Sequence, residues 1–434
     1  MTLNLTPDQK QANDKFIQFL LSDKKEFYLF GAAGCGKTFL TQFFIKNTFP
    51  QYLNMCRCIG IEPAVIDFAL TATTNKAVEV LQQNFVEDYV ETVFKYFKVV
   101  VVENYKNGEV YLKQDKYYSA TPKMLIIVDE CSMLSREMLK IIRKHSSNCK
   151  IVFVGDNYQL TPVNEKAYWN NTPEDVTAVL TTPVRNNGNT HLIDLCSQLR
   201  ETVDTKEFKD ILLFSGSIDH LDDDSVVEYL KNDYNVENAR ILCYTNVQVL
   251  NYINYLKNAY GIPKEIELNK PYINNHNVSD GNKTHFYAEE LLKVTAMGEP
   301  YYKTFGNCSV KGRDVIVSSI RTYKQMHSFI PESYTKVKEA IKKYKKLQDW
   351  KTYFQLSLYI MDLRLPYAST VHKAQGSTFD EVLIDLDSFG SCKDPDVAAR
   401  LLYVAVSRAK KRVLFYGSLP KRYGEIKCQV SNTA

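Results

Sequence analysis

The chain carries the stretch Gly31-Ala32-Ala33-Gly34-Cys35-Gly36-Lys37-Thr38, which decides the fold of its first half. An apolar run at 27–30 precedes it and a helical pattern at 39–45 follows, so we predict a strand, a glycine-rich turn and a helix. The spacing G-x-x-x-x-G-K-[ST] is that of the phosphate-binding loop. Glycines let the backbone approach a polyphosphate, and amide groups at the helix start favour an anion. We therefore expect a nucleoside triphosphate here, with Lys37 on the β- and γ-phosphates and the Thr38 hydroxyl on Mg²⁺. A chance glycine turn is the alternative, and the flanking strand and helix argue against it.

The size and composition are those of a globular protein with more than one domain. The chain has 434 residues, a length that exceeds what one hydrophobic core usually serves, and 45% of these residues are hydrophobic. It lacks an apolar run long enough to span a membrane and a signal peptide at its start, so we expect no membrane association and a cytoplasmic location. The ten cysteines are scattered, which favours free thiols. A net charge of +4 neither demands nor excludes a nucleic acid.

Acidic and amide side chains follow two further apolar runs of the first half. The run at 124–128 leads into Asp129 and Glu130, and the run at 150–154 leads into a polar loop that contains Gln159. Because the carboxyl ends of parallel strands share one edge of a sheet, these groups should face the phosphate-binding loop. Asp129 then suits Mg²⁺, Glu130 can activate the attacking water, and Gln159 can sense the γ-phosphate.

Two stretches interrupt this alternation of strands and helices. Valine-rich residues at 97–113 flank Asn107-Gly108, which predicts a hairpin whose two-residue loop sets Tyr105 opposite Val110 and Lys106 opposite Glu109. Beyond residue 190 the pattern restarts, with apolar runs at 239–246, 382–386 and 413–416, and residues 265–365 are inserted in it. This insertion holds a strand-like part at 314–317 and a basic helical part at 334–363. The lysines of the basic part form either a solvated helix face or a surface that contacts phosphates.

We predict an α/β protein with two domains and two insertions. The first domain comprises residues 1–93 and 119–190, with the hairpin insertion at 94–118. The second comprises residues 191–264 and 366–434, with the insertion at 265–365.

Seven stretches in order along nearly the whole chain resemble the motifs of superfamily 1 helicases, in particular the RecD- and Dda-like branch that moves 5′→3′ on DNA. The stretch 5–9 looks like the adenine-recognising Q motif, 71–77 like motif Ia, 129–133 like motif II and 155–162 like motif III. Residues 180–185 resemble motif IV, 369–378 motif V and 402–409 motif VI. One departure is Phe94, which stands where this family usually has a histidine in motif Ib; Phe94 could stack on a base instead.

This resemblance implies two RecA-like domains, with a strand-separating pin in the first and an SH3-like module with a helical tower, which braces the pin, in the second. It implies an ATP-dependent DNA helicase that uses Mg²⁺. The implied catalytic residues are Lys37, Glu130, Gln159 and two arginine fingers, Arg185 and Arg408. The implied nucleotide contacts are Gln9, the loop 31–38, Gln375 and Gly376, with Thr38 and Asp129 on the metal. The implied DNA contacts are Thr73, Thr74, Asn75, Lys76, Thr92, Phe94, Asn246, Thr370 and His372, with Tyr105, Tyr111 and Leu112 as candidate wedge residues of the pin.

The implied partners are single-stranded and forked duplex DNA. The protein is expected to be monomeric and to cooperate with replication, recombination or repair proteins. Three alternatives stay open at this point: a small-molecule kinase or simple P-loop ATPase, a nucleic-acid-binding module with a vestigial nucleotide site, and a helicase that acts on RNA. A P-loop ATPase alone would leave Ser407-Arg408 and the stretch 372–376 unexplained.

Overall fold

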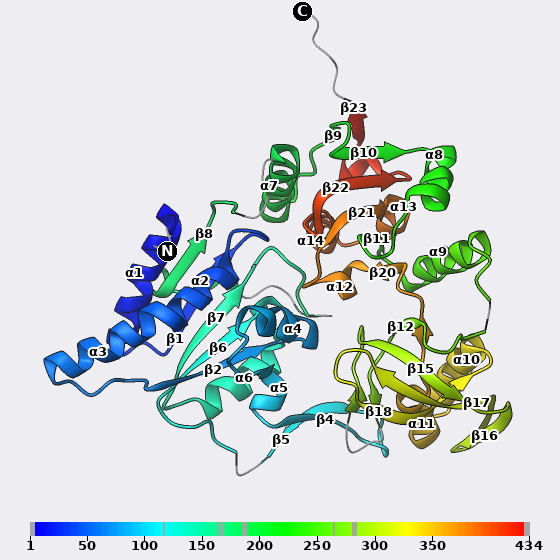
Figure 1. The fold of residues 1–434 in the computed structure, drawn as a ribbon, viewed down its shortest axis with the longest axis horizontal. Helices are drawn as coiled ribbons and strands as arrows, with labels where there is room; N and C mark the ends of the chain where they lie inside the picture. Colours follow the sequence, from blue (N-terminus) through cyan, green and yellow to red (C-terminus); the bar gives the residue numbers. More distant parts are fainter. Residues whose placement is uncertain are drawn as a thin grey trace, which may run out of the picture.

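The structure is a computed structural model that describes residues 5–115, 118–162, 165, 169–184, 189–263, 265–279 and 284–428. Figure 1 shows three bodies: a first α/β domain, a second α/β domain and a β-rich body beside the second. Within the described residues, no helix has the length and apolarity needed to cross a bilayer.

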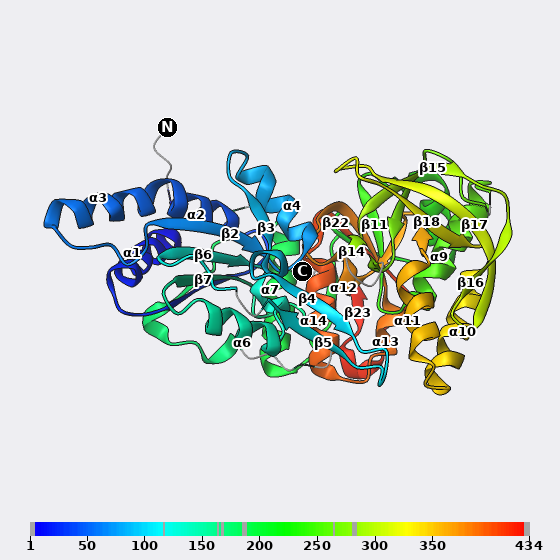
Figure 2. The same ribbon diagram turned by 90° about the horizontal axis from the view of Figure 1, so that it is seen from below.

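A parallel sheet of six strands forms the first domain, in the order β3-β2-β6-β7-β1-β8. Its helices cover both faces, with α2, α3 and α4 on one face and α6 on the other (Figure 2). The core is apolar strand residues packed against aromatic side chains, among them Phe16 and Phe44, whose rings stack at 4.1 Å. The elements are α1 (Pro7–Leu21), β1 (Glu26–Gly31), α2 (Lys37–Phe43), a π-helical turn (Phe44–Thr48), α3 (Phe49–Ile59), β2 (Asp67–Ala72), α4 (Asn75–Asn84), β3 (Val90–Thr92), α5 (Val93–Tyr96), β6 (Met124–Asp129), α6 (Arg136–His145), β7 (Lys150–Gly155) and β8 (Thr177–Leu180).

The second domain has a parallel sheet of five strands in the order β10-β22-β21-β11-β20. Helix α14 is buried along most of its length, because it fills the space between this sheet and the first domain. The elements are α7 (Thr190–Thr205), β9 (Ile211–Leu213), β10 (Ile218–Leu221), α8 (Asp223–Glu228), a π-helical turn (Tyr229–Asp233), β11 (Ala239–Cys243), α9 (Asn246–Ala259), β20 (Ala368–Thr370), α12 (Val371–Ala374), β21 (Phe379–Asp385), α13 (Leu386–Gly390), α14 (Pro395–Val406), β22 (Ala409–Tyr416) and β23 (Ile426–Cys428).

The insertion between α9 and β20 is an antiparallel sheet with two helices. Strands β16-β17-β15-β12-β19 are hydrogen-bonded in that order, and β18 pairs with β17. The basic helical part is two helices, and Val337 and Tyr344 bury one face of the first, with Ile341 packed beside them. The elements are β12 (Pro271–Asn274), β13 (Val278–Ser279), β14 (Thr284–Phe286), β15 (Leu291–Met297), β16 (Tyr301–Phe305), β17 (Cys308–Ser319), β18 (Gln325–Pro331), α10 (Tyr334–Lys346), α11 (Trp350–Tyr359) and β19 (Leu363–Arg364).

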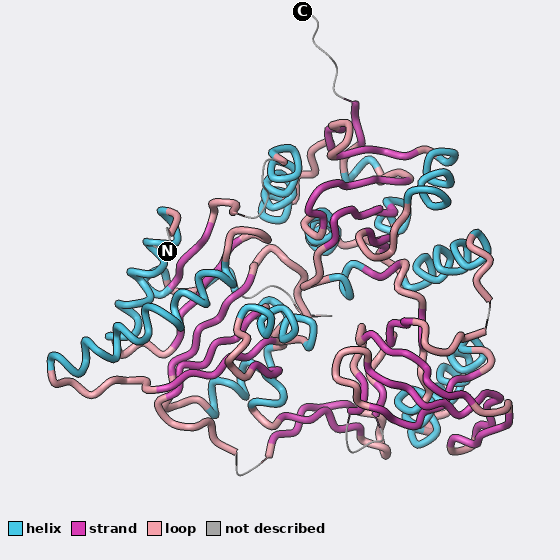
Figure 3. Tube along the Cα trace, in the orientation of Figure 1, coloured by secondary structure: helices cyan, strands magenta, loops and turns pink. Residues whose placement is uncertain are grey.

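The hairpin of the first domain consists of β4 (Val99–Glu103) and β5 (Val110–Gln114), and it reaches from the first domain to the insertion (Figure 3). Its register differs from the predicted one, because Glu103, not Tyr105, lies opposite Val110. A two-residue turn of type I′ needs a positive φ at both central residues, yet only Gly108 of the pair has one, at +76°. The Asn104 side chain accepts from the Lys106 amide at 3.0 Å and favours a longer loop over residues 105–108.

Candidate nucleotide and DNA site

The phosphate-binding loop joins β1 to α2 at the carboxyl edge of the first sheet. Gly34 and Gly36 have φ values of +84° and +79°, which residues with a Cβ rarely adopt. A Cβ on Gly36 would lie 2.7 Å from Nε2 of Gln9. The backbone therefore favours glycine at these two positions of the loop, and the Gln9 side chain lies beside Gly36.

Lys37 begins α2 and turns its side chain back over the loop. Its Nζ donates to the carbonyl oxygens of Gly31 at 2.8 Å and Ala32 at 3.0 Å. The Cys35 side chain is buried, and this burial raises the pKa of the thiol, although the Lys37 charge lowers it. A thiol that keeps its proton is a poor nucleophile, so Cys35 fills space in the loop.

Helix α1 begins beside this loop with a capping box. The Thr6 amide donates to Oε1 of Gln9 at 3.1 Å, so the first turn fixes the Gln9 side chain. Next to it, Oδ2 of Asp8 accepts from the amides of Thr181 and Thr182 at 2.8 and 2.9 Å. Burial raises the pKa of Asp8, but the hydrogen bonds from Thr6, Thr182 and Thr181 outweigh it and lower that pKa to about 2.

Two carboxylates stand at the end of β6, facing the phosphate-binding loop. Burial and the Glu130 charge raise the pKa of Asp129 to about 7, while the Glu130 amide and Lys37 lower it. Oε2 of Glu130 is buried without a hydrogen-bond partner among the described residues. The two acids, one of them with an unsatisfied oxygen, are oxygen donors of the kind that Mg²⁺ prefers. The residues present therefore fit a magnesium ion.

Gln159 lies where the two domains meet. It is buried, and its Oε1 accepts from Nε2 of Gln375 in the second domain at 3.0 Å. The same Gln375 nitrogen lies 3.5 Å from the hydroxyl of Ser132, just after the acidic pair. The predicted nucleotide residues of both domains thus share one hydrogen-bonded junction. Gly376, beside Gln375, has a φ of +81°.

Three further side chains of this junction escaped the sequence analysis. Tyr403 on α14 donates from its hydroxyl to Oδ2 of Asp156 at 2.6 Å, and neither side chain is exposed. Arg400, one turn earlier, donates to the carbonyl oxygens of Asn157 and Gln159 at 2.7 and 2.9 Å. The sequence does contain a signal, because Arg400 is the one basic residue of the mostly apolar helix α14.

Arg408 lies on the face of the second domain that is turned toward the first. Its guanidinium donates to the carbonyls of Val404 and Ser377 and to the Ser407 hydroxyl, at 2.9 to 3.1 Å. Burial lowers the pKa of Arg408, and the charge of Glu130 is the largest opposing effect. The predicted arginine finger is therefore within electrostatic reach of the predicted catalytic acid. The other predicted finger, Arg185, lies outside the described residues.

Motif Ia is bonded directly to the acidic pair. The Thr73 hydroxyl donates to the Glu130 carbonyl at 3.0 Å, and the Thr73 amide donates to the Asp129 carbonyl at 3.2 Å. Thr74 caps α4, whose first turn begins with the half-buried Asn75 and the exposed Lys76.

Motif Ib follows β3. Thr92 caps α5 by accepting from the Lys95 amide at 3.2 Å. Phe94 is half-buried, with part of its ring against the core of the first domain. The Thr92 hydroxyl is thus engaged locally, and only part of the Phe94 ring is open to solvent.

The predicted DNA contacts of the second domain lie at the ends of β11 and β20. Asn246 is exposed at the start of α9, and its Oδ1 accepts from Arg364 at 3.4 Å. Thr370 is buried, and the ring of His372 lies 6.5 Å from that of Tyr244. Burial lowers the pKa of His372, so its ring is neutral at physiological pH.

The hairpin tip rests on the insertion. The rings of Tyr105 and Phe354 are 5.1 Å apart, and a Cβ on Gly108 would lie 2.5 Å from the indole of Trp350. Tyr111 is exposed on β5, and Leu112, its neighbour in sequence, is half-buried.

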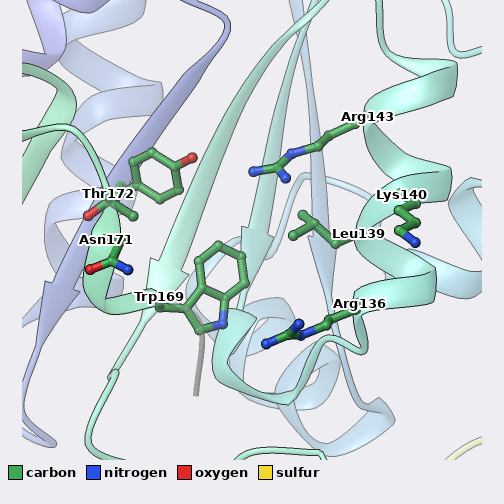
Figure 4. A pocket seen from close by; sticks show the side chains of 8 residues that line it. Arg136, Leu139, Lys140, Arg143, Trp169, Asn171 and Thr172 are labelled. Atoms are coloured by element: carbon green, nitrogen blue, oxygen red, sulfur yellow. The ribbon is translucent and has the colours of Figure 1, made fainter. Parts of the chain in front are cut away.

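A pocket of about 370 Å³ opens on the α6 face of the first sheet (Figure 4). Arg136 and Arg143 point into it from α6, opposite Trp169. None of the predicted nucleotide or DNA residues lines this pocket, so we assign it no part in the site.

Two parallel sheets that share one phosphate-binding site define a two-domain P-loop ATPase. The family profile described as a UvrD-like helicase C-terminal domain matches residues 365–416, and that of an AAA domain matches residues 15–165. The ATP-dependent DNA helicase Dda of Enterobacteria phage T4 is 23% identical over 95% of this chain and 99% of its own length. An uncharacterized protein of Acanthamoeba polyphaga mimivirus is 21% identical over 94% and 99%.

The Pif1 helicase from Bacteroides, solved in complex with ADP-AlF3 and ssDNA, has a similar fold. Its TM-score is 0.51 at 16% identity, over 98% of this chain and 95% of that one. Over nearly its whole length the chain is similar to superfamily 1 helicases, and it is an ATP-hydrolysing enzyme with two RecA-like domains.

Proposed function

We propose that this protein hydrolyses ATP to move 5′→3′ along single-stranded DNA and to unwind the duplex ahead of it. The observation that carries the proposal is the junction at Gln159. Gln159 bonds to Gln375 of the second domain, while the charge of Glu130 in the first domain raises the pKa of Arg408 in the second, against the lowering by burial. A hydrolysis site built from two domains makes turnover depend on their closure.

Each side chain of this site has a distinct part in hydrolysis. Lys37, now bonded to two loop carbonyls, turns to the β- and γ-phosphates when ATP is bound. Glu130 accepts a proton from the attacking water, and Arg408 stabilises the charge that develops on the transferred phosphoryl group. Thr38 and Asp129 would hold Mg²⁺, which would neutralise charge on the phosphates.

The proposed path of the DNA strand runs along the carboxyl ends of the two parallel sheets. Thr73, Asn75 and Lys76 form one grip on the first domain, while Asn246 and His372 form another on the second. Closure brings these two grips together and opening separates them, so each cycle shifts the strand relative to one domain.

The hairpin β4–β5 separates the strands. Its tip is braced from the other domain, because Tyr105 packs against Phe354 and Gly108 against Trp350. Separating one base-pair step costs about 1.4 kcal/mol of stacking on average. A hairpin that holds its place captures each opening of the fork.

The first test measures ATP hydrolysis with and without single-stranded DNA. We expect strong stimulation in the natural protein and none in Lys37→Ala, which should still bind the strand. Full ATPase activity in that variant would refute the site.

The second test offers duplexes with a single-stranded 5′ or 3′ tail, in DNA and in RNA. We expect unwinding of the 5′-tailed DNA alone. Unwinding from the 3′ tail would overturn the polarity, and unwinding of RNA alone would overturn the substrate. Stimulation of ATP hydrolysis by DNA without any unwinding would indicate a DNA-dependent translocase.

A further inference from the structure

Helix α10 carries the densest cluster of lysines in the described part of the chain. Six lysines lie on its 13 residues, and Glu339 is its one acid. None of the six has an ion-pair partner among the described residues, whereas Lys270, Lys303 and Lys311 elsewhere in the insertion do. The six are Lys336, Lys338, Lys342, Lys343, Lys345 and Lys346.

Three of these lysines form one row along the helix. Lys338, Lys342 and Lys346 are spaced by four residues, so they lie on one face about 6 Å apart. Lys342 and Lys346 are exposed, and Val337 and Tyr344 bury the opposite side. We call these three residues the lysine row.

The lysine row begins near the strand grip of the second domain. Burial lowers the pKa of Lys338, and so do the charges of Arg364, Lys342 and Lys373, while Asp362 raises it. Arg364 in turn donates to Asn246, a predicted DNA contact.

The row ends beside the hairpin tip. Lys346 is followed within four residues by Trp350, against which Gly108 of the hairpin packs. Both ribbon views place α11 between the tip and α10, so α10 is on the outer side of the brace (Figures 1 and 2).

We propose that the lysine row binds the phosphates of the strand that the hairpin displaces. This inference rests on the proposed function. A strand that passes outside the braced tip meets Lys346 first and then runs along α10 toward the second domain. The other strand stays on the inner side with the two grips. Lys338 lies over the Tyr334 ring at 5.2 Å, and Lys342 and Lys346 are exposed. Lysines at regular spacing bind a phosphate backbone without regard to sequence.

The test compares two DNA substrates with the same 5′ single-stranded tail. One is a simple tailed duplex, and the other is a fork whose second strand adds a non-complementary 3′ tail. The variant is Lys342→Glu with Lys346→Glu. The matched control is Lys46→Glu with Lys231→Glu, which changes net charge equally at two exposed lysines of the two α/β domains that have no ion-pair partner among the described residues.

We expect the natural protein and the control to bind the fork about fivefold or more tightly than the tailed duplex, with a steeper salt dependence. The row variant should lose that difference, because two phosphate contacts correspond to about 1.4 in the slope of log K against log salt. Its affinity for the tailed duplex and its ATPase stimulation by single-stranded DNA should stay unchanged.

Three results would overturn the proposal: no preference for the fork in the natural protein, a preference that survives in the row variant, or an equal loss on both substrates, which would indicate a duplex contact. A natural protein whose ATPase does not respond to DNA would instead refute the proposed function itself.

Discussion

Replacing Tyr403 with phenylalanine removes one oxygen atom from the contact between the domains. The Tyr403 hydroxyl donates to the Asp156 carboxylate at 2.6 Å, and both side chains are fully buried. Burial and the Asp156 charge raise the pKa of Tyr403 well above its usual value, so the hydroxyl keeps its proton and remains a donor. In the variant, the Oδ2 oxygen keeps one partner, Nε2 of Gln159 at a long 3.5 Å.

The expected cost follows from the charge and burial of this acceptor. A hydrogen bond to a charged group contributes about 1.5–3 kcal/mol, against about 0.5–1.5 for a neutral pair. Tyr423→Phe is the matched control, because that buried hydroxyl donates to a neutral carbonyl of Cys392 at 2.8 Å within the second domain. We therefore expect Tyr403→Phe to cost about 1 to 1.5 kcal/mol more than the control, since the two losses differ by that amount.

The assay measures ATP hydrolysis over a range of single-stranded DNA concentrations, together with urea unfolding of both variants. Because the bond lies between the domains, its loss should lower the DNA-stimulated kcat about tenfold, since each 1.4 kcal/mol corresponds to a factor of ten. The control should keep its stimulation. Equal stability losses in the two variants, with stimulation intact in both, would refute the view that this contact couples the domains.

Three further predictions concern the arginine finger, the hairpin and acid stability. Arg408→Ala should bind ATP but hydrolyse it about a thousandfold more slowly with DNA present. An unchanged rate of hydrolysis would refute the model of a site shared by two domains. Gly108→Ala should reduce unwinding and spare DNA-stimulated hydrolysis, because its Cβ would lie 2.5 Å from an indole ring; Gly216→Ala has an equally positive φ but open space around it and should unwind normally. The stability that Asp8 provides should be present above about pH 4 and disappear toward pH 2, because its folded pKa lies below the unfolded one; Asp8→Asn should lack that portion of the acid transition in a pH series of thermal melts.

Local patterns were enough to predict much of the fold. The alternation of apolar runs and polar loops led to both parallel sheets, because buried parallel strands are near-continuous apolar runs. The acidic pair at 129–130 and the loop around Gln159 lie at the predicted edge for the same reason. These features depend on residues within about ten positions of one another.

The hairpin register and the domain junction depend on more than local sequence. Asn107-Gly108 favours a two-residue loop, but the Asn104 side chain and the packing of Gly108 against Trp350 select a longer one. Tyr403 and Asp156 are 247 positions apart. Neither residue type at its own position indicates which partner the fold will supply.

The acidic turn after β6 links the chemistry to the DNA grip. Glu130 has a φ of +52°, which costs a residue with a Cβ about 1–2 kcal/mol. This conformation turns its carbonyl so that it accepts from both the Thr73 hydroxyl and the Met133 amide, at 3.0 and 3.1 Å. Glu130, the proposed base for the attacking water, is therefore joined by a hydrogen bond to Thr73, a proposed DNA contact. We therefore expect a shift of Glu130 during hydrolysis to move Thr73, which would link the γ-phosphate to the strand through this turn.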